Sequence, residues 1–181
     1  MARFGTMAEA TDRVSWGRRL IAGIADGVFS AILMMGFMMA YSSANGAGVT
    51  TPLKDLGALV YGVEALVAGS MAILAGAGIQ LGLSIVLGIL FALFTSRKTS
   101  IVAALFVGIM VGIVIWVAME LVVLPYMDPT MAARIALMPL AYFVAHLLFG
   151  IGLGLTPLFV RTFSRKRDER RFESPAEALP I

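Results

Sequence analysis

Four polar side chains in this sequence lie inside long apolar runs, where strongly polar groups are unusual: Asp26, Gln80, Glu120 and His146. Ionisable groups at membrane depth are costly, and they usually face the interior of a helix bundle or water. These four residues are therefore the candidates for chemistry inside a membrane.

Glu120, His146 and Gln80 are expected at similar depth in the outer half of a bundle, on three different helices. We predict that Glu120 and His146 lie within hydrogen-bonding distance, directly or through a water. This contact would satisfy two groups that are each expensive to bury alone. The favoured interpretation is that these three residues form a structural contact that holds the helices together. The alternative is a protonatable or ligand-binding site.

Asp26 lies about two turns, or roughly 10 Å, inside the first apolar run from its basic end. The simpler interpretation is that its carboxylate reaches back towards Arg18 or Arg19. The functional alternative is a proton or cation relay near the inner face.

Four methionines form two adjacent i, i+4 rows in the first apolar run: Met34, Met35, Met38 and Met39. Paired thioethers are typical of Cu(I) entry sites, since soft ligands select soft metals. Flexible methionines also fill irregular gaps between helices, and this interpretation is favoured because the chain has no cysteine. No cofactor is predicted, although a haem or pigment would have His146 as its axial ligand.

Composition assigns the chain to a broad class. Of its 181 residues, 60% are hydrophobic and only 14% are charged, and the mean hydropathy is +0.93. Soluble domains carry about 25% charged residues, and too little polar surface remains here to cover a soluble fold. The sequence therefore predicts an integral membrane protein.

Several classes of site are excluded or lack support. The absence of cysteine excludes disulfides and thiolate metal sites, and a single histidine excludes multi-histidine metal sites within one chain. The Gly150-x-Gly152-x-Gly154 run lacks the strand that dinucleotide binding requires. No other catalytic motif is found, so the protein is predicted not to be an enzyme.

The expected fold is an all-α, four-span membrane bundle, because crossing the hydrocarbon core takes roughly 20 helical residues. The four spans are predicted at Leu20–Tyr41, Val67–Phe94, Ile101–Leu124 and Leu140–Val160. Pro52–Leu66 is predicted to be a short interfacial or re-entrant helix on the outer face. A fifth span is the rival interpretation, but Thr51–Leu66 is short and carries three charges. Asp128 is expected to cap a short helix that runs to Arg134.

Basic residues predict the orientation. Twelve of the 14 Lys and Arg residues flank the predicted inner ends of the spans, against Lys54 and Arg134 on the other side. The positive-inside rule then places residues 1–19 and 161–181 in the cytoplasm. The first span is too long for the apolar region of a signal peptide, so it is expected to be permanent.

The C-terminal tail is basic. Its first cations, Arg161, Arg165, Lys166 and Arg167, are candidates for binding anionic lipid head groups. Simple anchoring of the topology is the more economical interpretation, and no nucleic-acid partner is predicted.

Small residues four positions apart recur in every span. Such spacing lets helix backbones approach closely in lipid, where no hydrophobic force drives helices together. The predicted packing residues are Gly23, Gly27, Gly78, Gly82, Gly108, Gly112, Gly150 and Gly154. A cavity-lining or hinge role is the alternative.

An internal repeat is also visible. Gln80–Gly88 aligns with His146–Gly154, Gly27–Ala40 with Gly108–Leu121, and Pro52 plays the part of Pro129. Both halves are predicted to start on the same side of the membrane, which makes the repeat a parallel one.

The sequence resembles small, uncharacterised four-span bacterial inner-membrane proteins of the YagU-like group. The resemblance lies in the Gly-rich then Met-rich first span, Thr51-Pro52-Leu53, Gln80–Gly88 and His146-Leu147-Leu148-Phe149-Gly150. This chain departs from the pattern at Gln80, a position that can carry a second histidine. The resemblance implies a fold and a location in the inner membrane, but no activity.

Two roles remain open. The favoured expectation is an accessory or structural subunit that packs against other membrane subunits or itself, with lipids as its remaining partners. The alternative is a small transporter or channel component whose pathway is lined by Gln80, Glu120 and His146. The first is favoured because four spans rarely enclose a pathway and no discontinuous helix is expected.

Overall fold

The computed structural model describes residues 16–67, 69–96 and 98–163, and all regular elements in these ranges are helical. In chain order they are α2 (Trp16–Ala44), α3 (Thr51–Tyr61), the 3-10 turn η1 (Gly62–Leu66), α4 (Ser70–Phe94), α5 (Ile101–Ala118), the π-helical turn η2 (Met119–Val123), α6 (Leu124–Met127), α7 (Pro129–Ile135) and α8 (Pro139–Gly154).

Four helical stretches are long and apolar enough to cross a membrane, which confirms the prediction of four span-length helices. They are Trp16–Ala44, Ser70–Phe94, Ile101–Met127 and Pro139–Phe163. The segment proposed as a rival fifth span forms α3 and η1, of 11 and 5 residues. Neither reaches the roughly 20 residues that one crossing needs.

Local sequence explains where the short helices begin and end. Pro52 lies in the first turn of α3, where the missing N–H costs no hydrogen bond. Gly62 follows α3 at φ 64°, a left-handed conformation that glycine adopts without strain. Asp128 accepts a hydrogen bond from the Met131 N–H at 2.9 Å, which confirms the predicted cap of α7.

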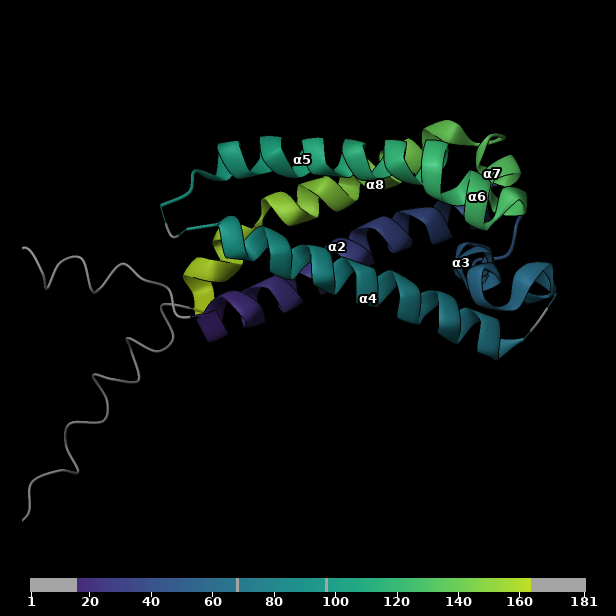
Figure 1. The fold of residues 1–181 in the computed structure, drawn as a ribbon, viewed down its shortest axis with the longest axis horizontal. Helices are drawn as coiled ribbons and strands as arrows, with labels where there is room; N and C mark the ends of the chain where they lie inside the picture. The colour runs from purple at the N-terminus through teal and green to yellow at the C-terminus, as the bar shows by residue number, and fades with distance from the viewer. Residues whose placement is uncertain (1–15, 68, 97, 164–181) are drawn as a thin grey trace, which may run out of the picture.

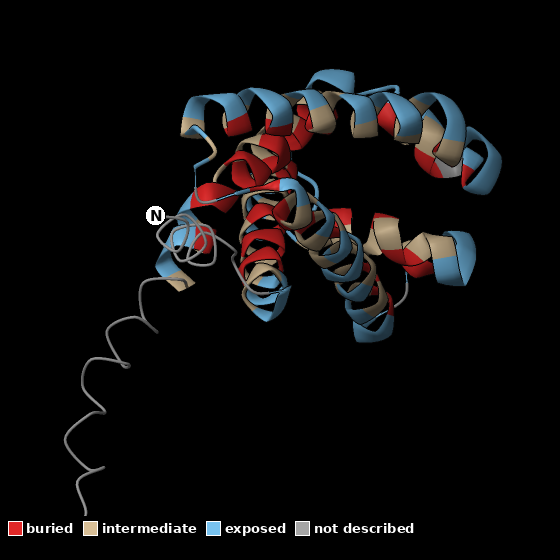
Figure 2. Cartoon of the chain, turned by 60° about the vertical axis from the view of Figure 1, so that its left-hand side comes forward, coloured by how far each residue is buried: buried red, intermediate tan, exposed pale blue. Residues whose placement is uncertain are grey.

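The four long helices form two hairpins that join through their central members. α2 packs against α4, α8 packs against α5, and α2 and α8 pack against each other. α4 and α5 flank this central pair and barely touch, although a short loop connects them. The two central helices, α2 and α8, accordingly carry most of the buried residues (Figure 2).

The two hairpins are arranged as the internal repeat predicts. α2 and α5 start at the same end of the bundle, and α3 and α7 both lie at the opposite end (Figure 1). We call this opposite end the α3/α7 end. The repeat aligns Gly27 with Gly108 and Ser84 with Gly150. A Cβ added at Gly27 would meet the Ser84 carbonyl, and one added at Gly108 would meet the Gly150 carbonyl. The two hairpins therefore cross at equivalent positions.

Six of the eight glycines expected at helix contacts lie in such contacts. Gly23 and Gly27 face α4, while Gly108, Gly112, Gly150 and Gly154 hold α5 against α8. The expectation is wrong for Gly78 and Gly82, since an added Cβ at either would meet nothing within 4 Å among the described residues. The α4 face that packs on α2 carries Ser84 and Gly88 instead.

Two further glycines, which the sequence analysis did not select, hold α3 against α4. A Cβ at Gly57 would collide with the Ala72 backbone, and one at Gly76 would collide with the Leu53 carbonyl. The short helix is therefore packed directly onto the second span.

The third and fourth long helices each contain a break in their α-helical hydrogen bonds, so the expectation of continuous helices is wrong for both. Pro125 has no N–H to donate to the Leu121 carbonyl, and the preceding turn widens so that the Leu124 N–H donates to the Met119 carbonyl, five residues back. In the fourth span, Pro157 leaves the Leu153 carbonyl without its helical donor, and the Thr156 hydroxyl lies 2.6 Å from that carbonyl.

Candidate functional site

A cavity with a volume of about 110 Å³ lies between the two outer helices, α4 and α5, in the described chain. α2 and α8 form its floor, and residues of α3, η2, α6 and α7 close it at the α3/α7 end. The cavity exists because α4 and α5 are held apart by the central pair.

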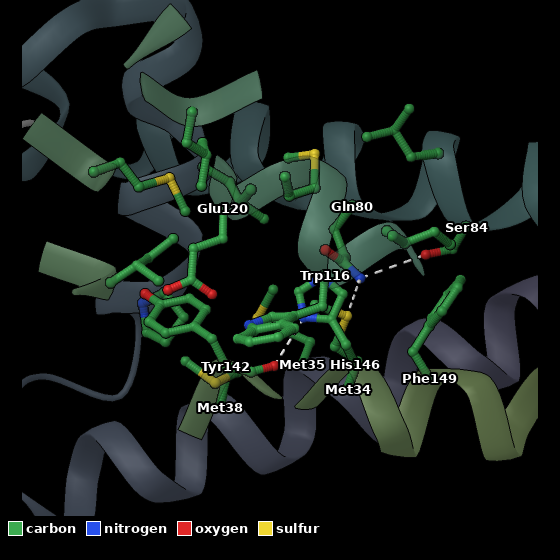
Figure 3. Close-up of a pocket in the computed structure, with 18 of the residues that line it drawn as sticks. Met34, Met35, Met38, Gln80, Ser84, Trp116, Glu120, Tyr142, His146 and Phe149 are labelled. Carbon is green, nitrogen blue, oxygen red and sulfur yellow. Dashed lines mark hydrogen bonds between the residues drawn. The ribbon is translucent and has the colours of Figure 1, made fainter. Parts of the chain in front are cut away.

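The three polar residues singled out for similar depth all line this cavity. Gln80 comes from α4, Glu120 from η2 and His146 from α8, and their side chains point into one space in Figure 3. Ser84, Trp116 and Tyr142 add polar atoms to a lining that is otherwise apolar. The cavity therefore combines an apolar wall with a few converging polar groups, as small-molecule sites commonly do.

Glu120 reaches the cavity from the π-helical turn. Its Oε2 atom is buried and has no hydrogen-bond partner among the described residues. A π turn inserted in an α-helix is rare and is found frequently at functional sites. Here the turn follows from Pro125, and it carries the one carboxylate among the residues that line the cavity.

Trp116 lies four residues before Glu120, on the same face of the helix. Its indole Nε1 is also buried and unpartnered within the part of the chain that the structure describes. The ring packs edge-on against Phe143, with centroids 5.0 Å apart. One turn of the third span therefore brings an unused donor and an unused acceptor to the same cavity.

His146 does not form the expected hydrogen bond with Glu120 in the described chain. Its Nδ1 lies 2.8 Å from the Tyr142 carbonyl oxygen, so this nitrogen carries a hydrogen and donates to the preceding turn of its own helix. A direct hydrogen bond between Glu120 and His146 is therefore absent from the described contacts, and a contact through a water stays a prediction. The donation at Nδ1 leaves Nε2 as the ring nitrogen with free hydrogen-bonding capacity.

Gln80 ties α4 to α2. Its Nε2 lies 3.4 Å from Ser84 Oγ and 3.5 Å from Met34 Sδ. Met35 and Met38 line the cavity beside Met34, and Met38 belongs to the buried core. The methionine rows therefore supply packing and cavity wall.

Asp26 lies apart from this cavity, buried between α2 and α8. Thr156 Oγ1 donates to its Oδ2 at 2.6 Å, while Oδ1 has no partner in the described ranges. The expectation that the carboxylate reaches Arg18 or Arg19 is corrected, because Asp26 is fully buried and faces α8. Arg19 donates instead to the Leu93 carbonyl at the end of α4.

An ion pair at the α3/α7 end was not anticipated. Arg134 Nη1 of α7 lies 2.5 Å from Asp55 Oδ1 of α3, which links the two short helices of the repeat. Burial raises the pKa of Asp55, Arg134 opposes this, and the nearby Asp128 adds to it. The signal available in the sequence was the position of opposite charges on the two Pro-led helices.

The basic tail is described only at its start. Arg161 Nη2 donates to the Thr99 carbonyl at 2.9 Å, which ties the end of the fourth span to the α4–α5 loop. Arg165, Lys166 and Arg167 lie outside the described residues, so their proposed contact with lipid stays a prediction.

Comparisons with known proteins found no match among protein-family models, curated proteins or solved structures. The resemblance to YagU-like proteins therefore stays a prediction. The arguments for function rest on the four apolar helices and on the cavity between α4 and α5.

Proposed function

We propose that this protein is a small, non-enzymatic membrane transporter or channel component that takes its ligand into the cavity between α4 and α5. The observation that carries this proposal is the convergence of Gln80, Glu120 and His146 on one cavity. The unpartnered atoms of Glu120 and Trp116 add to it, because buried polar atoms without partners are costly unless a ligand or water satisfies them.

The arrangement of the hairpins supports the same proposal. Two equivalent hairpins meet along α2 and α8, and the cavity lies across this junction, so it draws residues from both repeats. Substrate sites of secondary transporters typically lie at the interface between repeats. The interrupted third span at Glu120 is a further feature that this class shares.

Proton and cation flux into liposomes tests the proposal. Purified protein is reconstituted with a pH-sensitive or cation-sensitive dye trapped inside, and flux is driven by an imposed gradient. We expect wild-type protein to conduct, Glu120→Gln and His146→Phe to reduce the rate at least tenfold, and Glu64→Gln to match wild type. Glu64 is an exposed acidic residue at the same end of the molecule and serves as the control. Equal rates in protein-free and wild-type liposomes would refute the proposal.

An accessory-subunit role is the second candidate, and the exposed Gly78 and Gly82 favour it. These glycines form an open strip on α4 that a helix of another chain could approach closely. Native mass spectrometry after extraction in a mild detergent separates the two roles. A particle that contains other polypeptides supports the subunit role, whereas a particle of 19.2 kDa or a small multiple supports a self-contained transporter.

We further propose that the protein resides in a bacterial inner membrane with both termini in the cytoplasm and α3 at the outer interface. The distribution of basic residues supports this orientation through the positive-inside rule. Fusion of a periplasm-dependent reporter after residue 48 and after residue 181 tests it. Activity is expected only for the first fusion, and the reverse pattern would overturn the orientation.

A further inference from the structure

A second apolar cavity lies farther along the same two helices, beyond the cavity at Glu120. The second cavity has a volume of about 310 Å³ and is lined by the end of α4, the start of α5 and the loop between them. The first cavity reaches Leu87 and Ile115, and the second begins at Phe91 and Val111, one helical turn farther on each helix. The two cavities together define a seam between α4 and α5.

The length of this seam suits a chain molecule. Glu120 and Ala103 mark its two ends on the third span, and 17 residues of helix extend roughly 25 Å. The hydrocarbon core of a bilayer is about 30 Å thick, so the seam runs through most of it. Apart from two threonines at the loop end, the lining beyond Ser84 is apolar.

The head of the seam is acidic. Glu120 is the one carboxyl group among the residues that line the two cavities, and this lining contains no lysine or arginine. Arg134, the cation of neighbouring α7, is already paired with Asp55. An anionic or neutral occupant would leave the Glu120 oxygen without a counter-charge in an apolar setting, whereas a cation would supply one.

Aromatic and acceptor groups surround the same point. Trp116 lies one turn from Glu120, and indole is the best aromatic partner for a cation. Tyr142 and His146 face this pair from α8, again one turn apart, and Figure 3 shows all four side chains around one space. His146 Nε2 is available to accept a hydrogen bond when the ring is neutral, because Nδ1 donates to the backbone.

We propose that the ligand is a single-chain lipophilic cation, with an ammonium head against Glu120 and an apolar chain along the seam between α4 and α5. This inference rests on the proposed function, since it names the chemical class of ligand for the same cavity. It adds that the head group of the ligand must be positively charged. It also gives the orientation of the ligand, with the head group at the α3/α7 end and the chain pointing towards the α4–α5 loop.

Trp116 provides a built-in reporter for the experiment. The only other tryptophan is Trp16, which is 74% exposed at the far end of α2, and the variant Trp16→Phe removes it. The full chain is purified in a neutral sugar detergent, and Trp116 emission is followed during addition of decylammonium, decanol or decanoate. These three probes share one chain length and differ in head-group charge.

We expect decylammonium to shift the Trp116 emission saturably, with an affinity at least tenfold higher than that of decanol and with no saturable response to decanoate. Glu120→Gln should weaken decylammonium binding at least tenfold, Glu120→Asp should weaken it less, and Glu64→Gln should leave it unchanged. Val111→Phe narrows the seam at the end of the second cavity nearest to the first. It should weaken binding of dodecylammonium more than that of octylammonium.

Each alternative outcome has a distinct meaning. Equal responses to the three head groups, or a Glu120→Gln variant that binds decylammonium like wild type, would overturn the charge requirement and leave the cavity as a ligand site. Equal effects of Val111→Phe on the short and long chains would overturn the direction of the chain. A Trp116 emission that no probe changes would overturn this inference without bearing on ion flux, which the liposome assay measures separately.

Discussion

The close crossing of α5 and α8 predicts opposite effects for one substitution at two glycines. Gly108→Ala adds a methyl group at the crossing, where its carbon would fall 2.7 Å from the Gly154 nitrogen and closer still to the Gly150 carbonyl. Gly82→Ala adds the same group on α4 where nothing lies within 4 Å. Both positions are helical, so the pair isolates the effect of the contact.

The expected loss at Gly108 follows from the geometry. Measured to the Gly154 nitrogen, the added carbon lies about 0.7 Å inside the 3.4 Å at which ordinary contact begins, and the overlap with the Gly150 carbonyl is larger, so the two helices must separate by at least this amount. A gap of ~0.5–1 Å forfeits a quarter to a half of each atom-pair attraction, and each pair is worth ~0.1–0.2 kcal/mol. For about 40 such pairs, the number that one buried leucine side chain makes, the loss is about 1–4 kcal/mol, which overlaps the usual cost of overpacking.

The control should change in the other direction. Alanine at an exposed helical position is more favourable than glycine by about 0.5–1 kcal/mol, so Gly82→Ala is expected to be neutral or slightly stabilising. Unfolding by sodium dodecyl sulfate in mixed micelles, followed by Trp116 fluorescence, measures both free energies. Equal stability of Gly108→Ala and Gly82→Ala would refute the packing argument for the α5–α8 crossing.

Variants at three further positions test other contacts. Because burial raises the pKa of Asp55, the folded chain holds this proton more tightly than the unfolded chain, so the free energy of unfolding should fall as pH rises from about 3.8 through the raised value. Asp55→Asn should flatten that part of the profile in denaturant titrations at several pH values, and an unchanged slope would contradict the assignment. Asp26→Asn keeps an acceptor for Thr156 and should be more stable than Asp26→Ala, which removes the hydrogen bond between the two helices. This loss should cost about 0.5–1.5 kcal/mol, because the Thr156 hydroxyl can still donate to the Leu153 carbonyl. The order of their thermal midpoints checks this, and a reversed order would count against it. Asp128→Ala removes the cap of α7 and should cost about 1 kcal/mol in the same assay, and a loss below 0.3 kcal/mol would show that the cap contributes little.

The number of long helices could be predicted because it depends on the lengths of apolar runs. Each run exceeds what one crossing requires, and charged or Pro-led segments separate the runs. The cap at Asp128 could be predicted for a similar reason, since Asp-Pro at the start of a short helix is a local signal. These features follow from neighbouring residues alone.

The packing faces could not be predicted in the same way. In a membrane both the lipid-facing and the protein-facing sides of a helix are apolar, so hydrophobic periodicity does not distinguish them. Gly78–Gly82 and Ser84–Gly88 carry the same spacing on α4, yet only the second pair faces α2. The choice depends on how whole helices fit together.

The candidate site also combines features that could be predicted from the sequence with features that could not. Equal depth placed Gln80, Glu120 and His146 around one cavity, because depth can be counted along each run. Depth does not determine side-chain direction, so it could not show that His146 Nδ1 donates within its own helix rather than directly to Glu120. The π turn that presents Glu120 is a local response to Pro125, which was visible in the sequence as a break in the hydrogen-bond ladder.

The hydrogen bond between Asp26 and Thr156 has a consequence for biosynthesis. The two residues are 130 positions apart, on the first and last spans, so the carboxylate has no partner of its own chain until the fourth span has been made. At about 5–20 residues per second, translation of that interval takes roughly 7–26 s. During this time Asp26 lacks the hydroxyl that it contacts in the folded chain. The last span then supplies this hydroxyl, so a chain truncated before Thr156 could not form the contact between its first and last long helices.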